Sequence, residues 1–271
     1  MSELLIERDG AVLILTINRP ESANALTADL RNQIADQLTA VNTNPSIRCV
    51  IITSTGDRFF SAGGDLRAGR LPEWPDRPAG APEIPPGAIA RHNTTGAQRF
   101  MAAVMDCEKP VIAAVNGTAA GIGVHLALAC DLVIAADNAR FIELFVRRGL
   151  LPDGGGAYLL TRVLGLQQAK ELAFLGDDIP VERAKELGMV TRIVPQSELM
   201  TEARALAQRI ASGPTVAIMF SKWLLNRAQE SSRDQAFRDE SVAMEIVRSS
   251  ADSEEGVRAF VERRPVNFRG W

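Results

Sequence analysis

Two glycine-bearing turns carry the residues of this sequence that are best suited to chemistry. "FFSAGGDL" (59–66) comes after the apolar run "CVIITSTG", and "NGTAAGIG" (116–123) comes after "PVIAAV". Glycine lets a ligand approach the backbone closely, and exposed N–H groups at a helix start bind anions or developing negative charge. Two such groups directed at one carbonyl oxygen form an oxyanion hole. One glycine turn alone indicates only a tight turn, whereas the pair favours a site. Neither stretch fits a phosphate-binding motif.

A histidine follows the second turn directly. His125 is one of only two histidines in the chain, and it lies in the apolar stretch "VHLALAC". An imidazole with an unperturbed pKa near 6.5 suits acid–base catalysis. A packed, hydrogen-bonded histidine on an apolar helix fits the pattern equally well, so both interpretations of His125 are open.

The turns lie within an alternation of strand and helix patterns. "LLIERDGAVLILTINRP" predicts a hairpin that turns at Asp9-Gly10. Apolar residues recur at helical spacing from Leu26 to Val41, with Thr27 as the predicted N-cap. The runs "IRCVIITST", "PVIAAVN" and "DLVIAAD" predict buried strands. This alternation predicts an α/β fold.

Two segments depart from the alternation. Residues 67–93 are rich in Pro, Gly and Ala and show no periodicity, which predicts either a lid over a site or a surface excursion. After about residue 196 the pattern is almost entirely helical. These helices must pack on the α/β part or on another subunit to bury their apolar faces.

The composition of the chain limits the classes of protein to which it can belong. The chain of 271 residues is 46% hydrophobic and 23% charged, as in an ordinary globular protein. The net charge of −3 argues against a basic nucleic-acid binder. No apolar run reaches the about 20 residues needed to span a bilayer, and no signal peptide is evident. The three separated cysteines fit no metal spacing and predict reduced, buried thiols in a cytoplasmic protein.

Five stretches together resemble the crotonase, or enoyl-CoA hydratase/isomerase, superfamily. They are "NRPESANAL", "FFSAGGDL", "KPVIAAVNGTAAGIGVHLALACDLVIAADNARF", "GLLPDGGGAYLLTRVLG" and "FVERRP". The resemblance implies a crotonase-like spiral of ββα units over residues 1–195 and a C-terminal helical, trimerisation region over residues 196–271. It implies an acyl-CoA thioester substrate, with coenzyme A as part of that substrate and no metal or redox cofactor. It also implies a homotrimer, or a hexamer built as a dimer of trimers.

The resemblance assigns roles to both turns. The backbone N–H groups of Gly64 and Ile122 become the two donors of the oxyanion hole. Ile122 stands where the family has the middle glycine of a triplet, and it still supplies an N–H. The residues expected to hold coenzyme A are Ser22, Ala23, Ala62, Asp65, Leu66 and Arg67. Arg67 could meet a phosphate or be a solvated surface arginine.

The sequence departs from the family's hydratases at the two water-handling glutamates. The corresponding positions are His125 and Phe145. Paired carboxylates can position water and exchange protons, and a phenyl ring can do neither. Simple hydration of a 2-enoyl-CoA is therefore not expected.

Asp153 is the leading alternative acid–base residue, followed by His125. Isomerases that the sequence resembles often place a carboxylate at the position of Asp153, although an aspartate there could also cap the helix that begins near Gly154. Glu143 is expected to point elsewhere. Arg147 and Arg148 are expected to be surface or subunit-contact charges.

Three functions follow from these assignments. The favoured one is double-bond isomerisation of an enoyl-CoA through a thioester enolate. The second is hydration or ring opening with His125 as the acid–base group. The third is a catalytically silent acyl-CoA-binding protein.

Overall fold

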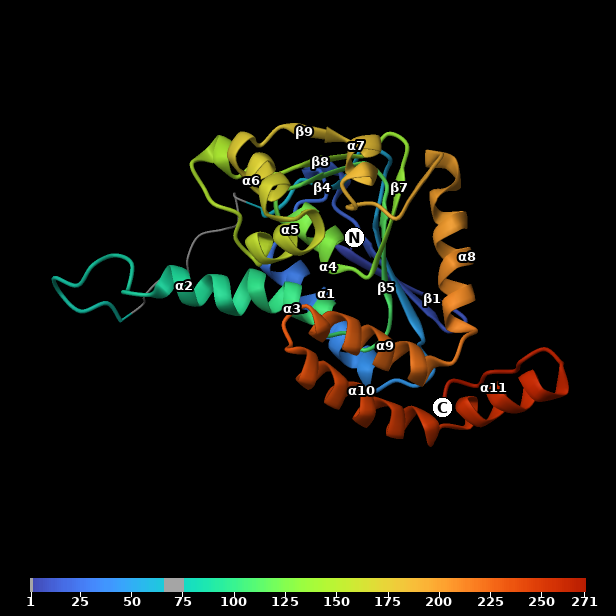
Figure 1. The fold of residues 1–271 in the computed structure, drawn as a ribbon. Helices are drawn as coiled ribbons and strands as arrows, with labels where there is room; N and C mark the ends of the chain where they lie inside the picture. The colour runs from blue at the N-terminus through green and yellow to red at the C-terminus, as the bar shows by residue number, and fades with distance from the viewer. Residues whose placement is uncertain (1, 66–75) are drawn as a thin grey trace.

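Two β-sheets and the helices around them form the body of the protein (Figure 1). The structure, a computed structural model, describes residues 2–65 and 76–271. The larger sheet has the strand order β1-β2-β3-β5-β7-β10 and the smaller has β4-β6-β8-β9. β1 pairs with β2, and β8 with β9, in antiparallel fashion, while the other pairs are parallel. The predicted α/β class is confirmed.

The strands of the larger sheet lie in the apolar runs that predict strands, except for the last one, which was not predicted. They are β1 (Leu4–Asp9), β2 (Val12–Ile17), β3 (Cys49–Ser54), β5 (Val111–Val115), β7 (Leu132–Ala136) and β10 (Arg192–Val194). The predicted hairpin is confirmed, because Asp9 pairs with Val12 and Gly10 adopts a φ of +60°. The smaller sheet has only three-residue strands: β4 (Phe59–Ser61), β6 (Thr118–Ala120), β8 (Arg140–Ile142) and β9 (Asp178–Pro180).

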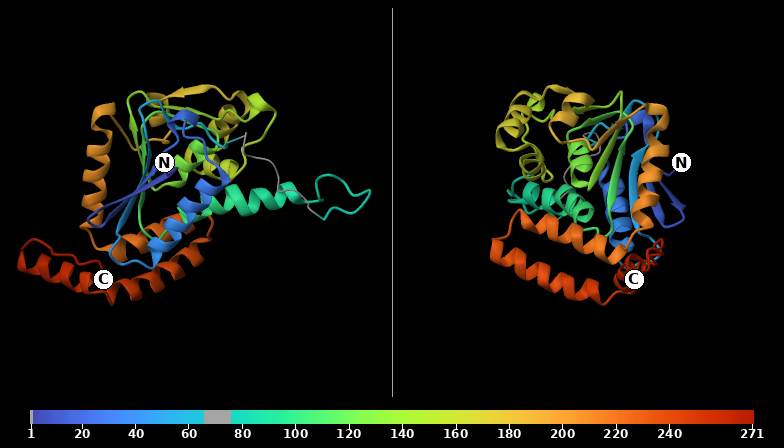
Figure 2. Two further views of the ribbon diagram at one scale, coloured as in Figure 1. Left: turned by 180° about the vertical axis from the view of Figure 1, so that it is seen from behind. Right: turned by 45° about the vertical axis from the view of Figure 1, so that its right-hand side comes forward.

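Helices cover both faces of the larger sheet (Figure 2). On one face, α1 (Ala28–Asn42) buries Leu30, Ile34 and Leu38 against the sheet. Thr27 caps this helix as predicted, and its hydroxyl accepts the backbone N–H of Leu30 at 3.1 Å. On the other face, α8 (Leu199–Ala211) packs on Ile14, Ile51 and Ile112 and the residues around them. The remaining elements before α8 are η1 (Pro20–Ser22), α2 (Ala88–Asn93), η2 (Thr94–Gln98), α3 (Arg99–Met105), α4 (Ile122–Ala129), η3 (Val146–Arg148), α5 (Gly156–Leu164), α6 (Leu166–Leu175), α7 (Val181–Glu186) and η4 (Gln196–Glu198).

The interpretation of residues 67–93 as a loop is wrong at its C-terminal end. Helix α2 begins after Gly87, whose φ is +77°, and it runs through η2 directly into α3. Figure 1 shows α2 projecting away from the body. None of its residues is buried, whereas α3 buries Phe100, Met101 and Val104. The outer turns thus have no core to face, and their sequence carries no apolar period. Residues 67–75, the first part of the segment predicted as a lid or a surface excursion, lie outside the described residues.

The C-terminal helices form an arm beneath the body (Figure 2). They are α9 (Thr215–Ala228), α10 (Arg233–Arg248) and α11 (Ala251–Glu262). The predicted C-terminal helical region is confirmed, although its first helix, α8, belongs to the packing of the sheet. Among the described residues, no helix is long and apolar enough to cross a membrane.

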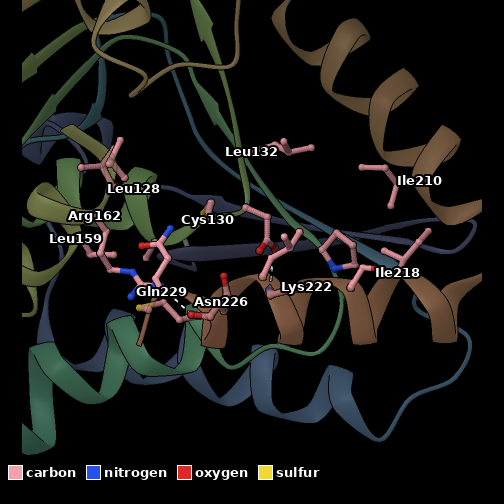
Figure 3. Close-up of a pocket in the computed structure, with 17 residues that line it drawn as sticks. Leu128, Cys130, Leu132, Leu159, Arg162, Ile210, Ile218, Lys222, Asn226 and Gln229 are labelled. Atoms are coloured by element: carbon pink, nitrogen blue, oxygen red, sulfur yellow. Dashed lines mark hydrogen bonds and ion pairs between the residues drawn. The ribbon is translucent and has the colours of Figure 1, made fainter. Parts of the chain in front are cut away.

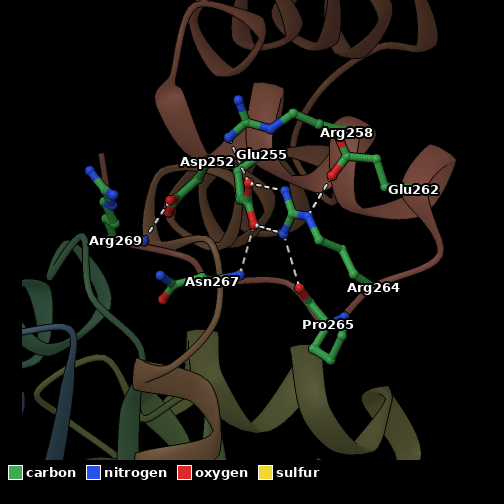
Figure 4. Close-up of polar contacts among 8 residues, drawn as sticks. All are labelled: Asp252, Glu255, Arg258, Glu262, Arg264, Pro265, Asn267 and Arg269. Atoms are coloured by element: carbon green, nitrogen blue, oxygen red, sulfur yellow. Dashed lines mark hydrogen bonds and ion pairs between the residues drawn. The ribbon is translucent and has the colours of Figure 1, made fainter.

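Polar contacts fold the last residues of the chain back onto α11 (Figure 4). The Glu255 carboxylate bonds to the guanidinium groups of Arg258 and Arg264. Asp252 is buried, and its two carboxylate oxygens accept the backbone N–H groups of Arg269 at 2.6 Å and Gly270 at 2.7 Å. Glu255 also accepts the backbone N–H of Asn267 at 3.0 Å, so two carboxylates of α11 hold the C-terminal backbone in place.

Candidate active site

The two glycine turns meet at the wall of one cavity of about 420 Å³. Gly63 and Gly64 follow β4, and Gly121 and Ile122 connect β6 to α4. All four line the cavity, so the structure brings together the residues that the sequence singled out. Each turn leaves a three-residue strand of the smaller sheet, and β4 and β6 are neighbours in that sheet.

The backbone N–H groups of Gly64 and Ile122 are available to a ligand. Leu26 donates to the carbonyl of Gly63 at 2.8 Å and accepts from Asp65 at 3.1 Å, which leaves the intervening N–H of Gly64 unpaired within the described ranges. Ile122 is the first residue of α4, and its N–H likewise has no acceptor among the residues that the structure describes. The first N–H groups of a helix have no intrahelical partner.

The turns touch each other backbone to backbone. A Cβ atom added to Gly63 would lie 2.8 Å from the carbonyl oxygen of Ala120 and 3.7 Å from the nitrogen of Ile122. A Cβ at Gly123 would lie 2.6 Å from the carbonyl oxygen of Ser61. Only glycine permits these approaches, and they place the Gly64 turn beside the start of α4.

Asp153 lines the same cavity with an exposed side chain. The alternative interpretation of Asp153 as a helix cap is wrong. Helix α5 begins at Gly156 with Gly155 as its N-cap residue, and no side chain caps it. Gly154 and Gly155 have φ values of +57° and +92°, and these two left-handed residues separate Asp153 from the start of the helix.

His125 lies behind the cavity wall. Its side chain is fully buried, and it is not among the residues that line the cavity. Its Nε2 atom lies 3.2 Å from a carboxylate oxygen of Glu143, and its ring stacks on Phe145 with the centroids 5.2 Å apart. Phe145 itself lines the cavity. Glu143 is buried and is not among the residues that line the cavity, while the acid–base role of His125 stays a prediction.

Three basic side chains on the wall were not assigned to the site from the sequence. They are Arg31 of α1, His92 of α2 and Arg148 of η3. Burial lowers the pKa of Arg31, and the nearby charge of Asp153 opposes that shift. A signal for Arg31 exists in the sequence, because a cation in the first turn of a helix opposes the helix dipole. Arg147 pairs with Asp178 at 3.2 Å on the surface, as expected of a surface charge.

The residues expected to hold coenzyme A lie beside the Gly64 turn. The N–H of Ala62 donates to the carbonyl of Ala23 at 2.9 Å, and Ser22 precedes Ala23 at the end of η1. Ala62 and Asp65 line the cavity, and Asp65 forms an ion pair with Arg19 at 3.0 Å. Leu66 and Arg67 lie outside the described residues.

A larger cavity of about 610 Å³ lies elsewhere, between the body and α9 (Figure 3). Its wall contains Cys130 and the ion pair of Asp131 with Lys222, whose charged atoms are 2.8 Å apart. All three cysteines are buried and free, as predicted. Among the described residues, no group of three or more His, Cys, Asp or Glu side chains could hold a metal ion. The smaller cavity is the one that joins the glycine turns to an acid–base side chain.

Comparison with known proteins identifies the family. The family described as enoyl-CoA hydratase/isomerase matches residues 7–270. The chain belongs to this family. Its relatives include a crotonyl-CoA hydratase of Syntrophomonas wolfei, 36% identical over 98% of this chain and 97% of the relative. The 1,2-epoxyphenylacetyl-CoA isomerase of Escherichia coli is also 36% identical, over 100% of this chain and 99% of the relative.

Solved structures of the enoyl-CoA hydratase/isomerase family share the fold. The enoyl-CoA hydratase from Bacillus anthracis superimposes with a TM-score of 0.89 at 31% identity, and each chain is covered completely. The predicted crotonase superfamily and crotonase-like fold are therefore confirmed. This protein is an acyl-CoA enzyme of the enoyl-CoA hydratase/isomerase family, in which relatives are named after both hydration and isomerisation.

Proposed function

We propose that this family member shifts the double bond of an enoyl-CoA thioester through an enolate intermediate. The observation that carries the proposal is the position of Asp153: its carboxylate lines the cavity of the two glycine turns and caps no helix. The other carboxylate on this wall, Asp65, is engaged with Arg19. Phe145 occupies the wall where a hydratase of this family has a glutamate, which disfavours the handling of water.

In the proposed reaction, the thioester carbonyl oxygen accepts the N–H groups of Gly64 and Ile122. Asp153 removes a proton from C2 of a 3-enoyl-CoA, and the C–H electron pair enters the conjugated enolate. The protonated Asp153 then returns the proton to C4, and the double bond moves to C2–C3. The reaction consumes no water and needs no redox cofactor or metal. Each N–H donor typically contributes about 3–4 kcal/mol in such a transition state.

We also propose that the arm of α9, α10 and α11 contacts other copies of the chain in a trimer or hexamer. Apolar side chains of this arm are exposed in the single chain, namely Leu225, Phe237, Val242, Phe260 and Val261. Burying them between copies would be favourable. Light scattering of the purified protein tests this assembly, and a monomer at micromolar concentration would exclude it.

The substitution Asp153→Asn tests the reaction. An amide cannot accept and return a proton, so we expect the rate of 3-enoyl-CoA isomerisation to fall by about 10²-fold or more. Because Asp153 caps no helix, the melting temperature should stay within a few degrees and acyl-CoA should still bind. Asp57→Asn, at an exposed aspartate outside the cavity, is the matched control and should leave the rate unchanged.

Two results would contradict the proposal. Full isomerase activity in Asp153→Asn would remove the proposed base and leave His125 as the leading acid–base residue. Hydration of crotonyl-CoA by the unaltered protein at about 10² s⁻¹ or faster would favour the hydratase reaction instead.

A further inference from the structure

The cavity carries a cation that the proposed isomerisation does not use. Arg31 lies on the wall together with Asp153, and its guanidinium Nε atom is buried. No residue within the described ranges accepts a hydrogen bond from this side chain or forms an ion pair with it. A buried donor without an acceptor destabilises a protein, so the free protein leaves this group unsatisfied.

The placement of Arg31 is unfavourable for the folded chain alone. Arg31 lies in the first turn of α1, where the positive end of the helix dipole repels a cation. Burial adds a desolvation cost, which lowers the pKa of the guanidinium, and the Asp153 charge offsets part of it. Two unfavourable effects at one cavity-lining side chain point to a ligand that satisfies it.

Other basic groups share the same wall. Arg148 and His92 also line the cavity, each from a different element. Of the two carboxylates there, Asp65 is paired with Arg19 outside this basic group. The wall near Arg31 therefore carries more N–H donors than the Asp153 carboxylate can accept and more positive charge than it can neutralise.

We propose that the acyl chain of the substrate ends in a carboxylate and that Arg31 binds it. This inference rests on the proposed function, because it assumes that the thioester lies at Gly64 and Ile122. A guanidinium presents a planar pair of N–H donors that matches the two oxygens of a carboxylate. The substrate class is thus the thioester of coenzyme A with a dicarboxylic acid. A phosphate of coenzyme A has similar chemistry, and the experiment separates the two sources.

Calorimetric binding of saturated thioesters tests the proposal without requiring any double-bond shift. Adipyl-CoA is compared with hexanoyl-CoA, which has the same chain length without the carboxylate; succinyl-CoA and suberyl-CoA cover shorter and longer chains. We expect at least one dicarboxylic thioester to bind about 10-fold or more tightly than the neutral analogue of its length, as for a hydrogen-bonded charge. Arg31→Met should abolish that preference and leave the binding of hexanoyl-CoA unchanged.

The control is Arg99→Met, which removes a nearby exposed arginine that pairs with Asp36 and does not line the cavity. It should preserve the preference. Arg31→Lys keeps the charge without the paired donors, so an intermediate preference is expected, and it replaces Arg31→Met if that variant does not fold.

Equal weakening of the dicarboxylic and neutral thioesters in Arg31→Met would assign Arg31 to a coenzyme A phosphate and overturn the proposal. Equal affinities in the unaltered protein at every chain length would also overturn it. A failure of isomerisation alone would leave these binding results unaffected.

Discussion

Replacing Gly156 by alanine tests the packing behind the cavity. A Cβ atom at Gly156 would lie 2.2 Å from Cε1 and 2.4 Å from Nε2 of His125. The imidazole is fully buried, bound to Glu143 and stacked on Phe145. It cannot move aside without disturbing those contacts. The new methyl group must therefore displace either the ring or the start of α5, which directly follows the Asp153 loop.

The expected cost is at the upper end for an overpacked core, about 3 kcal/mol, because both groups in contact are held rigidly. A chain of 271 residues has an unfolding entropy of about 570 cal/mol/K when each residue contributes about 2.1 cal/mol/K. The melting temperature should consequently fall by about 5 °C. The isomerisation rate should fall too, since Asp153 moves with the start of the helix.

Calorimetric melting of a small set of variants checks this reasoning. Gly256→Ala is the control, because Gly256 is also helical but its Cβ would lie 3.4 Å from the nearest atom of Phe268. Its effect should stay within about 1 kcal/mol. In the double variant Gly156→Ala/His125→Ala, the methyl group occupies space that the ring has left. The two changes should then cost about 1–3 kcal/mol less together than the sum of the single effects. Strictly additive effects would refute the contact.

Three further changes have defined outcomes. Gly64→Pro removes one N–H donor, so kcat should fall by about 10²-fold or more with the circular dichroism spectrum retained; unchanged turnover would exclude this donor. Burial raises the pKa of Cys49 to about 12, whereas an unfolded thiol titrates near 8.5. Only the unfolded state then loses this proton between those values, so the free energy of unfolding should fall as the pH rises above about 8.5. Urea titrations should show that Cys49→Ala reduces the loss by up to about 1.4 kcal/mol per pH unit; identical slopes in both proteins would count against it. Asp252→Asn should speed the release of Trp271 by carboxypeptidase, because Asp252 holds the adjacent backbone N–H groups; an unaltered rate would show that other contacts fix the tail.

Features set by neighbouring residues could be predicted from the sequence. The hairpin at Asp9-Gly10 and the cap at Thr27 depend on a few adjacent side chains, and both are confirmed. The two glycine turns were recognisable because each follows a strand-like apolar run. The two turns meet at one cavity because β4 pairs with β6. Strands of three residues are too short to show an apolar period in the sequence, so this pairing could not be predicted.

Features set by distant partners were missed or misread. The alternative role of Asp153 as a helix cap is excluded because Gly154 and Gly155 take left-handed conformations that composition does not reveal. The place of Arg31 in the first turn of a helix marked it as unusual, but only folding brings it to the same wall as Asp153. The position of His125 behind Phe145 likewise depends on a contact between two separate elements.

The backbone contact between the two glycine turns separates the binding of the thioester from the proton chemistry, two tasks that often depend on the same residues in an enzyme. A Cβ atom at Gly63 would lie 2.8 Å from the carbonyl oxygen of Ala120, and one at Gly123 would lie 2.6 Å from that of Ser61, so direct backbone contact sets the spacing of the two turns. Substitution of an exposed wall side chain such as Asp153 can therefore redirect the proton chemistry without changing this backbone contact. For protein engineering, the exposed side chains of the cavity wall are therefore the positions to vary, and the paired glycine turns are the part to keep unchanged, when new acyl-CoA reactions are designed.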